Sequence, residues 1–341
     1  MSPKQSVIDA FLHKEHDVIP YHFNFTQRAL DRMIEYTKDV EIERKLKINT
    51  CMNYMQYQGR PTELADHPGF FLDEFGVIWN RSGVDKDIGV IDHPTIEDLE
   101  ESDYHLPPMD EEKLRREYEF LTSQNKDKFT MAGFGLFFFE RSWSLMSMEN
   151  LLANMILCPK ELDAFLDKLC DYYMSMLDIA LEYDIDGVYF GDDWGQQRGL
   201  IMGPSHWRRF IKPHISRLYS RVKSAGKFIV QHSCGDCLEI FPDLIEMGLD
   251  CYQTFQPEIY DIKKVKETYG QDLSFWGGIS TQRCLPFMTP EEVQQETIRI
   301  MRTMKPGGGY IAAPTHAMPY DIPSENILAM VDVFQNQNKY L

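Results

Sequence analysis

A histidine and a cysteine two positions apart are the residues of this sequence whose chemistry is easiest to assign. His232 and Cys234 come at the end of the apolar run KFIVQH (227–232). In an extended backbone, residues two apart point to the same face, so one metal ion can bind both side chains. Zinc takes three or four N, S or O ligands at roughly 2.0–2.3 Å. The pair is therefore a candidate half of a zinc site; the alternative is a packed pair without metal.

Cys234 also forms a C-x-x-C motif with Cys237. A redox pair at the start of a helix is an alternative interpretation, because a helix N-terminus lowers the pKa of a thiol. The sequence lacks a proline between the two cysteines and lacks a thioredoxin-like context. Cys237 would also lie one turn into the following helix, which favours the metal interpretation of Cys234.

Carboxylates follow two further apolar runs. Asp192 and Asp193 come after DGVYFG (186–191), and Glu140 lies in GLFFFERSW after FTMAGF (129–134). The two aspartates could form an acid/base pair, accept hydrogen bonds from a substrate, or cap the following helix. Successive residues of a strand point to opposite faces, so we expect at most one of them to face a common site.

Apolar runs and amphipathic segments alternate from about residue 125 onward. Short apolar runs predict strands and amphipathic stretches predict helices, and their alternation is typical of a parallel sheet with crossover helices. The predicted strands are 129–134, 186–191, 227–232, 249–254, 273–278 and 309–313, and the predicted helices are 147–182, 204–225, 236–247, 260–269, 289–304 and 323–337.

Two more strands would complete an eight-stranded barrel. VIPYHFNF (18–25) is a plausible first strand, and a second would lie between residues 46 and 125, where EFGVIWNRSG resembles an inserted hairpin. The predicted fold class is therefore α/β: a (β/α)8 TIM barrel, one domain over residues 1–341 with an N-terminal insertion. An open doubly wound sheet is the alternative, although no glycine-rich nucleotide-binding loop is present.

In such a barrel the C-terminal ends of the strands share one rim, where active sites lie. His316 follows the last predicted strand, which would close the barrel against the first, so it is the expected third metal ligand. Glu140 is a candidate fourth ligand that yields to substrate. Aromatic residues gather near the same rim and some are expected to wall a pocket; they are Phe134, Phe137, Phe138, Phe139, Trp143 and Trp194.

Composition limits the classes of partner. The 341 residues are 43% hydrophobic and 26% charged, and no run approaches the roughly 18 to 20 apolar residues of a membrane span. The N-terminus shows no secretory signal, so a cytoplasmic protein without disulfides is expected, its seven cysteines mostly core residues. The formal charge of −18 argues against nucleic acid and anionic membranes as partners. Small neutral substrates and protein partners remain, and a homodimer is compatible with the sequence.

Several segments together resemble the uroporphyrinogen decarboxylase superfamily, which includes the cobamide-dependent methyltransferases. They are ERSWSLMSMENLLANMI, DDWGQQRGLIMGPSHWRRFIKP, HSCGD, WGGIS and GGGYIAAPTHAMPYDIPSENI, within roughly 60% of the chain. The resemblance implies a TIM barrel. In the methyltransferase branch it also implies zinc held by the His and Cys of an H-x-C motif and by a Cys near the C-terminus. His232 and Cys234 match the motif, whereas His316 stands where the third ligand would be Cys.

This departure indicates a direction of chemistry. One thiolate and two imidazoles leave zinc more electrophilic than two thiolates do, which suits polarisation of an ether or amine leaving group. We therefore expect methyl transfer from a small methoxylated aromatic to the Co(I) corrinoid (cobalamin) of a partner protein, as in an O-demethylase system. Asp192 or Asp193 would orient the substrate and Glu140 would give a proton. Phe134, Phe138, Tyr189 and Trp194 would bind the substrate.

Three alternatives remain open. The decarboxylase branch resembles this chain in fold, but it depends on an arginine-rich N-terminal segment, and here that region holds only Arg28 and Arg32. A methylcobamide:thiol methyltransferase would use the same zinc in thiol methylation. A non-catalytic scaffold or ligand sensor would bind no metal, and the change Cys234→Ala would then cost only packing energy.

Overall fold

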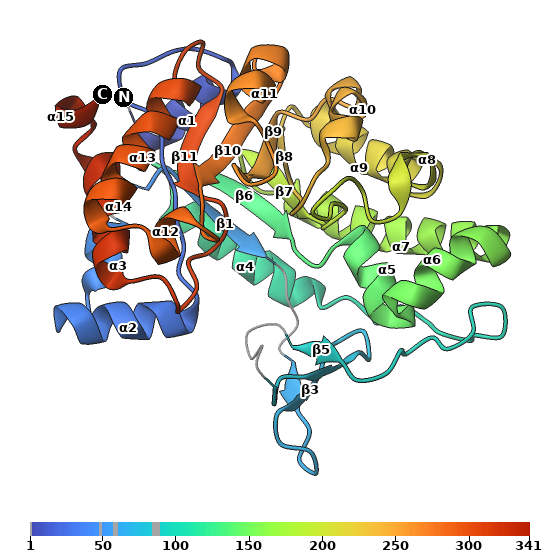
Figure 1. Ribbon diagram of the computed structural model, residues 1–341. Coiled ribbons are helices and arrows are strands. Elements are labelled where there is room, and N and C mark those ends of the chain that lie inside the picture. The colour runs from blue at the N-terminus through green and yellow to red at the C-terminus, as the bar shows by residue number, and fades with distance from the viewer. Residues whose placement is uncertain (1, 48–49, 57–60, 84–88) are drawn as a thin grey trace.

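The computed structural model describes residues 2–47, 50–56, 61–83 and 89–341. Its centre is a parallel sheet of seven strands in the order β1-β6-β7-β8-β9-β10-β11 (Figure 1). The strands are β1 Met52–Gln56, β6 Phe129–Phe134, β7 Gly187–Gly191, β8 Phe228–His232, β9 Cys251–Phe255, β10 Ser274–Ile279 and β11 Tyr310–Pro314. A TIM-barrel-like parallel sheet is therefore confirmed.

The predicted strands after residue 125 agree closely with the structure. Strand β6 has the predicted bounds, and the other five begin and end within two residues of the prediction. Every residue of β6, β7, β9, β10 and β11 is buried. Strands covered on both faces read as continuous apolar runs, which explains why the pattern predicts them so well.

The N-terminal strands differ from the prediction. Residues 18–25 form no regular strand, only single bridges from Tyr21 to Ala312 and from Phe25 to Met318. The segment nevertheless joins both edges of the sheet, because His22 N–H donates to Ala312 O and Cys51 N–H donates to Tyr21 O, each at 3.0 Å. The strand sought between residues 46 and 125 is β1.

A second, antiparallel sheet is inserted between β1 and β6. Its strands, in this order, are β2 Thr62–Glu63, β3 Phe70–Leu72, β4 Ile78–Asn80 and β5 Val90–Ile91. The predicted hairpin EFGVIWNRSG contains β4, which pairs with β3. Figure 1 shows this small sheet projecting away from the parallel sheet.

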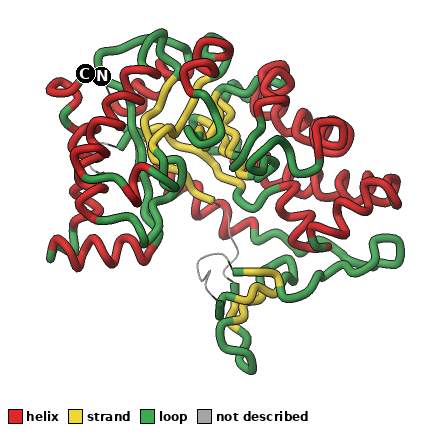
Figure 2. Tube along the Cα trace, in the orientation of Figure 1, coloured by secondary structure: helices red, strands yellow, loops and turns green. Residues whose placement is uncertain are grey.

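Helices lie around the parallel sheet (Figure 2). The predicted helix 147–182 is interrupted at Cys158, and Pro159 begins a new helix. Proline is favoured at this first position, because the N–H that it lacks would form no hydrogen bond within the helix. The helical segments are α1 Pro3–Phe11, α2 Gln27–Thr37, α3 Ile42–Leu46, α4 Glu111–Gln124, α5 Phe138–Met146, α6 Met148–Leu157, α7 Pro159–Ala180, α8 Gly203–His206, the π-helix η1 Trp207–Ile211, α9 Lys212–Ser224, the 3-10 helix η2 Leu238–Ile240, α10 Phe241–Glu246, α11 Ile262–Tyr269, α12 Cys284–Phe287, α13 Pro290–Met304, α14 Ser324–Gln335 and α15 Gln337–Tyr340.

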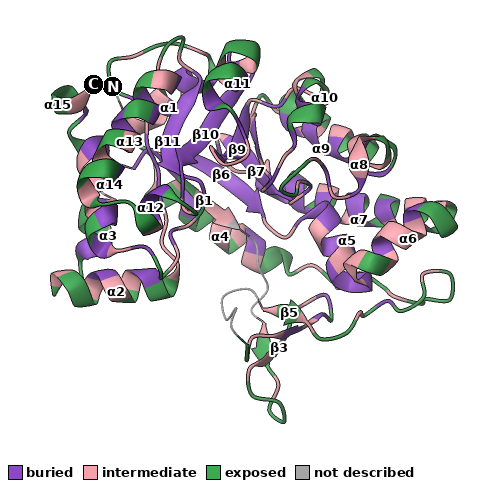
Figure 3. Cartoon of the chain, in the orientation of Figure 1, coloured by how far each residue is buried: buried purple, intermediate pink, exposed green. Residues whose placement is uncertain are grey.

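Helix α1 packs against the N-terminal ends of the strands. The ring of Phe11 lies 5.4 Å from those of Phe129 and Phe228, the first residues of β6 and β8. Helix α1 therefore covers this end of the sheet, whose strands are buried (Figure 3). The C-terminal ends remain available for a site. No helix among the described residues is both long and apolar enough to cross a membrane.

Candidate metal centre

A cavity of about 440 Å³ lies at the C-terminal ends of the parallel strands. Two groups of its lining residues come from different parts of the fold. The strand wall consists of Tyr189, His232, Gln253, Trp276 and His316, and the inserted wall consists of Asp73, Glu74, Phe75, Trp79 and Arg81. The cavity thus joins the parallel sheet to the inserted segment.

The structure brings His232, Cys234 and His316 together. One ligand atom from each lies within 4.8 Å of the others, and His232 Nε2 is 3.8 Å from Cys234 Sγ. His232 ends β8, and His316 comes two residues after β11. Because parallel strands end at the same edge of the sheet, residues 84 positions apart meet at one point, as the sequence predicts.

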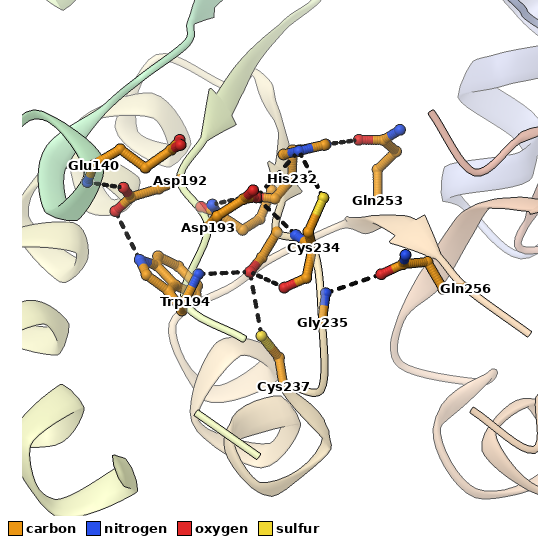
Figure 4. A network of polar contacts seen from close by, with 12 residues as sticks. Glu140, Asp192, Asp193, Trp194, His232, Cys234, Gly235, Cys237, Gln253 and Gln256 are labelled. Atoms are coloured by element: carbon orange, nitrogen blue, oxygen red, sulfur yellow. Dashed lines mark hydrogen bonds and ion pairs between the residues drawn. The ribbon is translucent and has the colours of Figure 1, made fainter. Parts of the chain in front are cut away.

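Gln253 fixes the orientation of the His232 imidazole through its Nδ1 atom. His232 Nδ1 hydrogen-bonds Gln253 Oε1, and the Tyr189 hydroxyl donates to the same oxygen at 3.2 Å. An amide oxygen accepts, so Nδ1 carries the proton and Nε2 is left as the ligand atom. Figure 4 shows Gln253 beside the imidazole and Cys234 below it.

Asp193 lies beside the same ligand atoms. Its Oδ1 is 3.3 Å from His232 Nε2 and accepts the Cys234 backbone N–H at 2.7 Å. Burial disfavours the charge on both side chains, but the contact with His232 lowers the pKa of Asp193 to about 2. Tyr189 and then Asp193 raise the pKa of His232 well above its usual value. Asp193 therefore supports the Nε2 side of the imidazole.

Asp192 points the other way and caps helix α5. Its carboxylate accepts N–H groups of Phe139 at 3.0 Å, Glu140 at 2.8 Å and Trp194 Nε1 at 2.7 Å (Figure 4). Backbone N–H groups in the first turn of a helix lack partners within it, so Asp192 satisfies two of them. Burial raises the pKa of Asp192 to about 7 although these donors lower it. Asp192 is not among the described residues that line the cavity, so it positions α5 and does not meet the expectation of a catalytic carboxylate.

Glu140 lines the cavity from the first turn of α5. Burial raises the pKa of its carboxyl well above the usual value, and the negative charges of Asp193 and Asp192 raise it further. This upward shift favours the protonated carboxyl, which is the form that a general acid needs.

The aromatic residues predicted to bind substrate divide into two groups. Phe134 and Tyr189 line the cavity, whereas Phe138 and Trp194 are fully buried outside it. Phe138 packs its ring 5.1 Å from His214, and Trp194 packs 5.3 Å from Trp207. Their position just after a strand could not reveal which way the turn rotates them.

Sequence reasoning missed several cavity residues. His22, Tyr54 and Trp276 line it with their rings in contact, His22 lying 5.3 Å from Trp276. Burial lowers the pKa of His22 to about 3, so its imidazole is neutral. An aromatic residue in the predicted strand 273–278 was the available signal for Trp276; His22 and Tyr54 lie where the sheet was least predictable.

The C-x-x-C motif is not a redox pair here. Cys237 Sγ contacts Ser233 Oγ at 3.3 Å and points away from Cys234 (Figure 4). Burial raises the pKa of the Cys237 thiol to about 12, which makes it unreactive. Gly235, between the two cysteines, is required by close packing of the backbone, because a Cβ at this position would lie 2.3 Å from the backbone of Gly195.

Comparison with known proteins supports the family and the fold. The profile described as uroporphyrinogen decarboxylase (URO-D) matches residues 83–337. A methylated-thiol–coenzyme M methyltransferase of Methanosarcina mazei is 22% identical over 55% of this chain and 48% of its own. A uroporphyrinogen decarboxylase of Psychromonas ingrahamii is 22% identical over 53% and 50%. The chain spans about half the length of the curated relatives it matches.

The solved structure of a methyltransferase from Methanosarcina mazei superposes with a TM-score of 0.74 at 17% identity, covering 99% of both chains. This likeness extends the shared fold beyond the segment that the family profile matches. Because that profile covers most of the chain, the protein belongs to the uroporphyrinogen decarboxylase family.

Proposed function

We propose that this protein is a zinc-dependent methyltransferase that moves a methyl group from a small methoxylated aromatic to the Co(I) corrinoid of a partner protein. The observation that carries the proposal is the convergence of His232, Cys234 and His316 beside the cavity. These residues come from two strand ends far apart in sequence, and a shared metal gives them a common role.

The donor set suits zinc. One thiolate and two imidazoles are among the ligands that zinc prefers, and Gln253 holds His232 in the tautomer that leaves Nε2 free to bind. Three protein ligands with a cavity beside them are the pattern of a catalytic zinc, which keeps a position for substrate. When bound, zinc supplies Lewis acidity at the ether oxygen of the substrate.

The chain itself supplies a proton and an apolar surface. Glu140 lines the cavity and its raised pKa favours the protonated carboxyl, so it can give its proton to the oxygen that leaves when the methyl group departs. Tyr54, Tyr189 and Trp276 form an aromatic surface with Tyr54 and Tyr189 stacked at 5.0 Å, against which an aromatic substrate can pack.

The relatives support methyl transfer at a coarser level. One curated relative and one solved structure of the same fold are methyltransferases. We assign the methyl-donor reaction, and not thiol methylation, because His316 replaces the second thiolate and leaves the zinc more electrophilic.

A decarboxylase acting on a polycarboxylated tetrapyrrole fits the cavity less well. Arg28 and Arg32 lie over the Tyr320 ring, at 4.7 and 5.3 Å, and neither is among the described residues that line the cavity. Arg141 in the cavity wall is already paired with Asp73. Among the described lining residues the one other arginine is Arg81, which lies over the Phe71 ring at 5.1 Å. Little cationic surface therefore remains to hold several carboxylates.

We also propose how the barrel closes, where the partner docks and where the reaction takes place. Residues 20–22 are hydrogen-bonded to Cys51, just before β1, and to Ala312 of β11. They would take the place of the eighth strand and close a (β/α)8 barrel, within one domain over residues 1–341. The corrinoid protein would dock over the mouth of the cavity, and the reaction would take place in the cytoplasm.

Metal analysis tests this function first. Zinc content would be measured by elemental mass spectrometry in the wild type and in His232→Ala, Cys234→Ala and His316→Ala, with circular dichroism to verify folding. Cys237→Ala, which removes a buried thiol outside the site, is the matched control. We expect near-stoichiometric zinc in the wild type and the control, and loss in the other three, together with loss of methyl transfer to a reduced corrinoid protein. A folded, metal-free wild type that also fails to take up added zinc would refute the proposal.

A further inference from the structure

The inserted side of the cavity holds a buried arginine that the proposed chemistry does not use. Arg141 lines the cavity and its side chain is 7% exposed. Its Nη1 donates to Asp73 Oδ2 at 2.8 Å and to Ser144 Oγ at 3.4 Å, and its guanidinium lies 3.9 Å from the centre of the Phe75 ring. The group is therefore fixed in place on several sides.

This guanidinium has donors left over. Arginine carries five N–H groups, and the bonds to Asp73 and Ser144 both use Nη1. The Tyr173 hydroxyl contacts the guanidinium, while Nε is buried with no hydrogen-bond partner among the residues that the structure describes. Nε is closed off from the cavity, so it is not the donor that meets a ligand. The two Nη2 N–H groups take no part in the bonds to Asp73 and Ser144, and because Arg141 lines the cavity, a ligand there can accept from them.

The charges around Arg141 indicate what kind of ligand. Asp73 neutralises the guanidinium and is itself held by N–H groups of Phe75, Val77 and Trp79. A second carboxylate brought to this pair would leave a net negative charge in a buried place, which is costly. Glu74 and Asp193 also line the cavity, and Arg81 lies over the Phe71 ring at 5.1 Å. An uncharged oxygen fits these surroundings better than an anion.

We propose that Arg141 forms a substrate subsite for an uncharged oxygen acceptor, such as a phenolic hydroxyl, ether or carbonyl. The inference rests on the proposed function and narrows its substrate class to neutral aromatics that carry an oxygen besides the methoxy group. The subsite lies on the inserted side of the cavity, so one end of the substrate is held by Arg141 while the methoxy end reaches the strand wall.

Calorimetric binding tests the subsite without any methyl transfer. The probes are anisole, the three methoxyphenols, 4-methoxybenzamide and 4-methoxybenzoate, and the proteins are the wild type, Arg141→Lys and Ser142→Ala. Lysine keeps the charge beside Asp73 but lacks the planar set of donors. Ser142→Ala removes a buried hydroxyl of the same helix that bonds Phe138 O and does not line the cavity, so it is the matched control.

We expect the best methoxyphenol to bind the wild type and Ser142→Ala about tenfold tighter than anisole, and the benzamide to bind tighter than the benzoate. The advantage over anisole should vanish in Arg141→Lys. Equal affinities of anisole and all methoxyphenols for the wild type, or tighter binding of the benzoate, would overturn the subsite even if Arg141→Lys does not fold. Absent methyl transfer with the binding contrast intact would refute the proposed function alone.

Discussion

The two walls of the cavity are built in different ways. In the strand wall, His232 ends β8 and Gln253 lies within β9, so the register of a buried parallel sheet sets their positions. In the inserted wall, Phe75 and Trp79 depend on hydrogen bonds to one carboxylate, that of Asp73. Groups that perform chemistry need the more rigid support, while a wall held by side chains can change with the substrate.

Helix α5 connects the two walls. Glu140 reaches the strand wall near Asp193, and the next residue, Arg141, pairs with Asp73 of the inserted wall. Asp192 fixes the first turn of this helix by accepting two of its backbone N–H groups. Neighbouring residues on one helix turn point about 100° apart, so a single element serves both sides of the cavity.

Removing zinc is expected to give the largest difference between the roles of the two walls. Dialysis against a chelator should abolish methyl transfer, because the activating Lewis acid is lost, and added zinc should restore it. The tighter binding of methoxyphenol over anisole should survive, because the contacts of Arg141 are with Asp73, Ser144 and Phe75 and not with the three ligand residues. Calorimetry on the stripped protein checks this. Loss of that contrast with the zinc would show that the walls are not independent.

Glu140→Gln should give the next largest effect. The amide cannot give a proton to the leaving oxygen, so methyl transfer should fall by about a hundredfold. Zinc content should remain that of the wild type, because Glu140 is assigned the proton and not the metal. Single-turnover kinetics with elemental analysis tests both points, and a parallel loss of zinc would reassign Glu140 as a fourth ligand.

Gln253→Leu tests the support behind His232. Without the amide oxygen, His232 Nδ1 loses its partner and the Tyr189 hydroxyl loses its acceptor. Such supporting contacts are worth about 10- to 100-fold in metal affinity. Competition with a chelating dye measures the change. Unchanged zinc affinity would mean that the sheet alone orients the imidazole.

The strand wall was largely predictable and the inserted wall was not. Buried strands show as apolar runs, so the H-x-C pair and His316 could be placed on one rim from the sequence. Strand β1, with the sequence MNYMQ, has polar Asn53 and Gln56 and gives no such run. The Arg141–Asp73 pair joins residues 68 positions apart through an irregular insertion, a contact that no local pattern reports.

The direction of side chains beyond the strand ends was equally hidden. Asp192 and Asp193 are adjacent, and the alternation rule indicated that only one would face the site, but not which one. Phe138 and Trp194 were expected in the pocket and instead pack into the core. Where a strand passes into a loop, the backbone rotates by amounts that tertiary packing decides.

Asp73→Asn should weaken the inserted wall alone. Asparagine retains one acceptor oxygen, but it cannot balance the charge of Arg141 or accept all four N–H groups. A loss of about 1.5 kcal/mol in the free energy of unfolding is expected from the weakened charge-assisted bonds. Methoxyphenol binding should weaken while zinc affinity stays constant. Chemical denaturation with calorimetry tests this, and reduced zinc affinity would contradict it.

Asp243→Asn provides the smallest effect and a reference outside both walls. Asp243 in α10 pairs with Arg208 at 2.9 Å and Lys212 at 2.7 Å. Burial raises the pKa of Asp243, but the hydrogen bonds to Arg208 and Lys212 lower it by more, so the net shift of the pKa is downward. The pair therefore stabilises the fold above the unfolded pKa and loses this contribution as pH falls through the lower folded pKa.

We expect Asp243→Asn to unfold about 1 kcal/mol more easily than the wild type at pH 7, with the difference shrinking below about pH 4. A difference that stayed constant down to pH 3 would contradict the ionic origin. Zinc content and the methoxyphenol contrast should both match the wild type. If this distant loss of stability altered either one, the effects of Gln253→Leu and Asp73→Asn could no longer be attributed to their own walls.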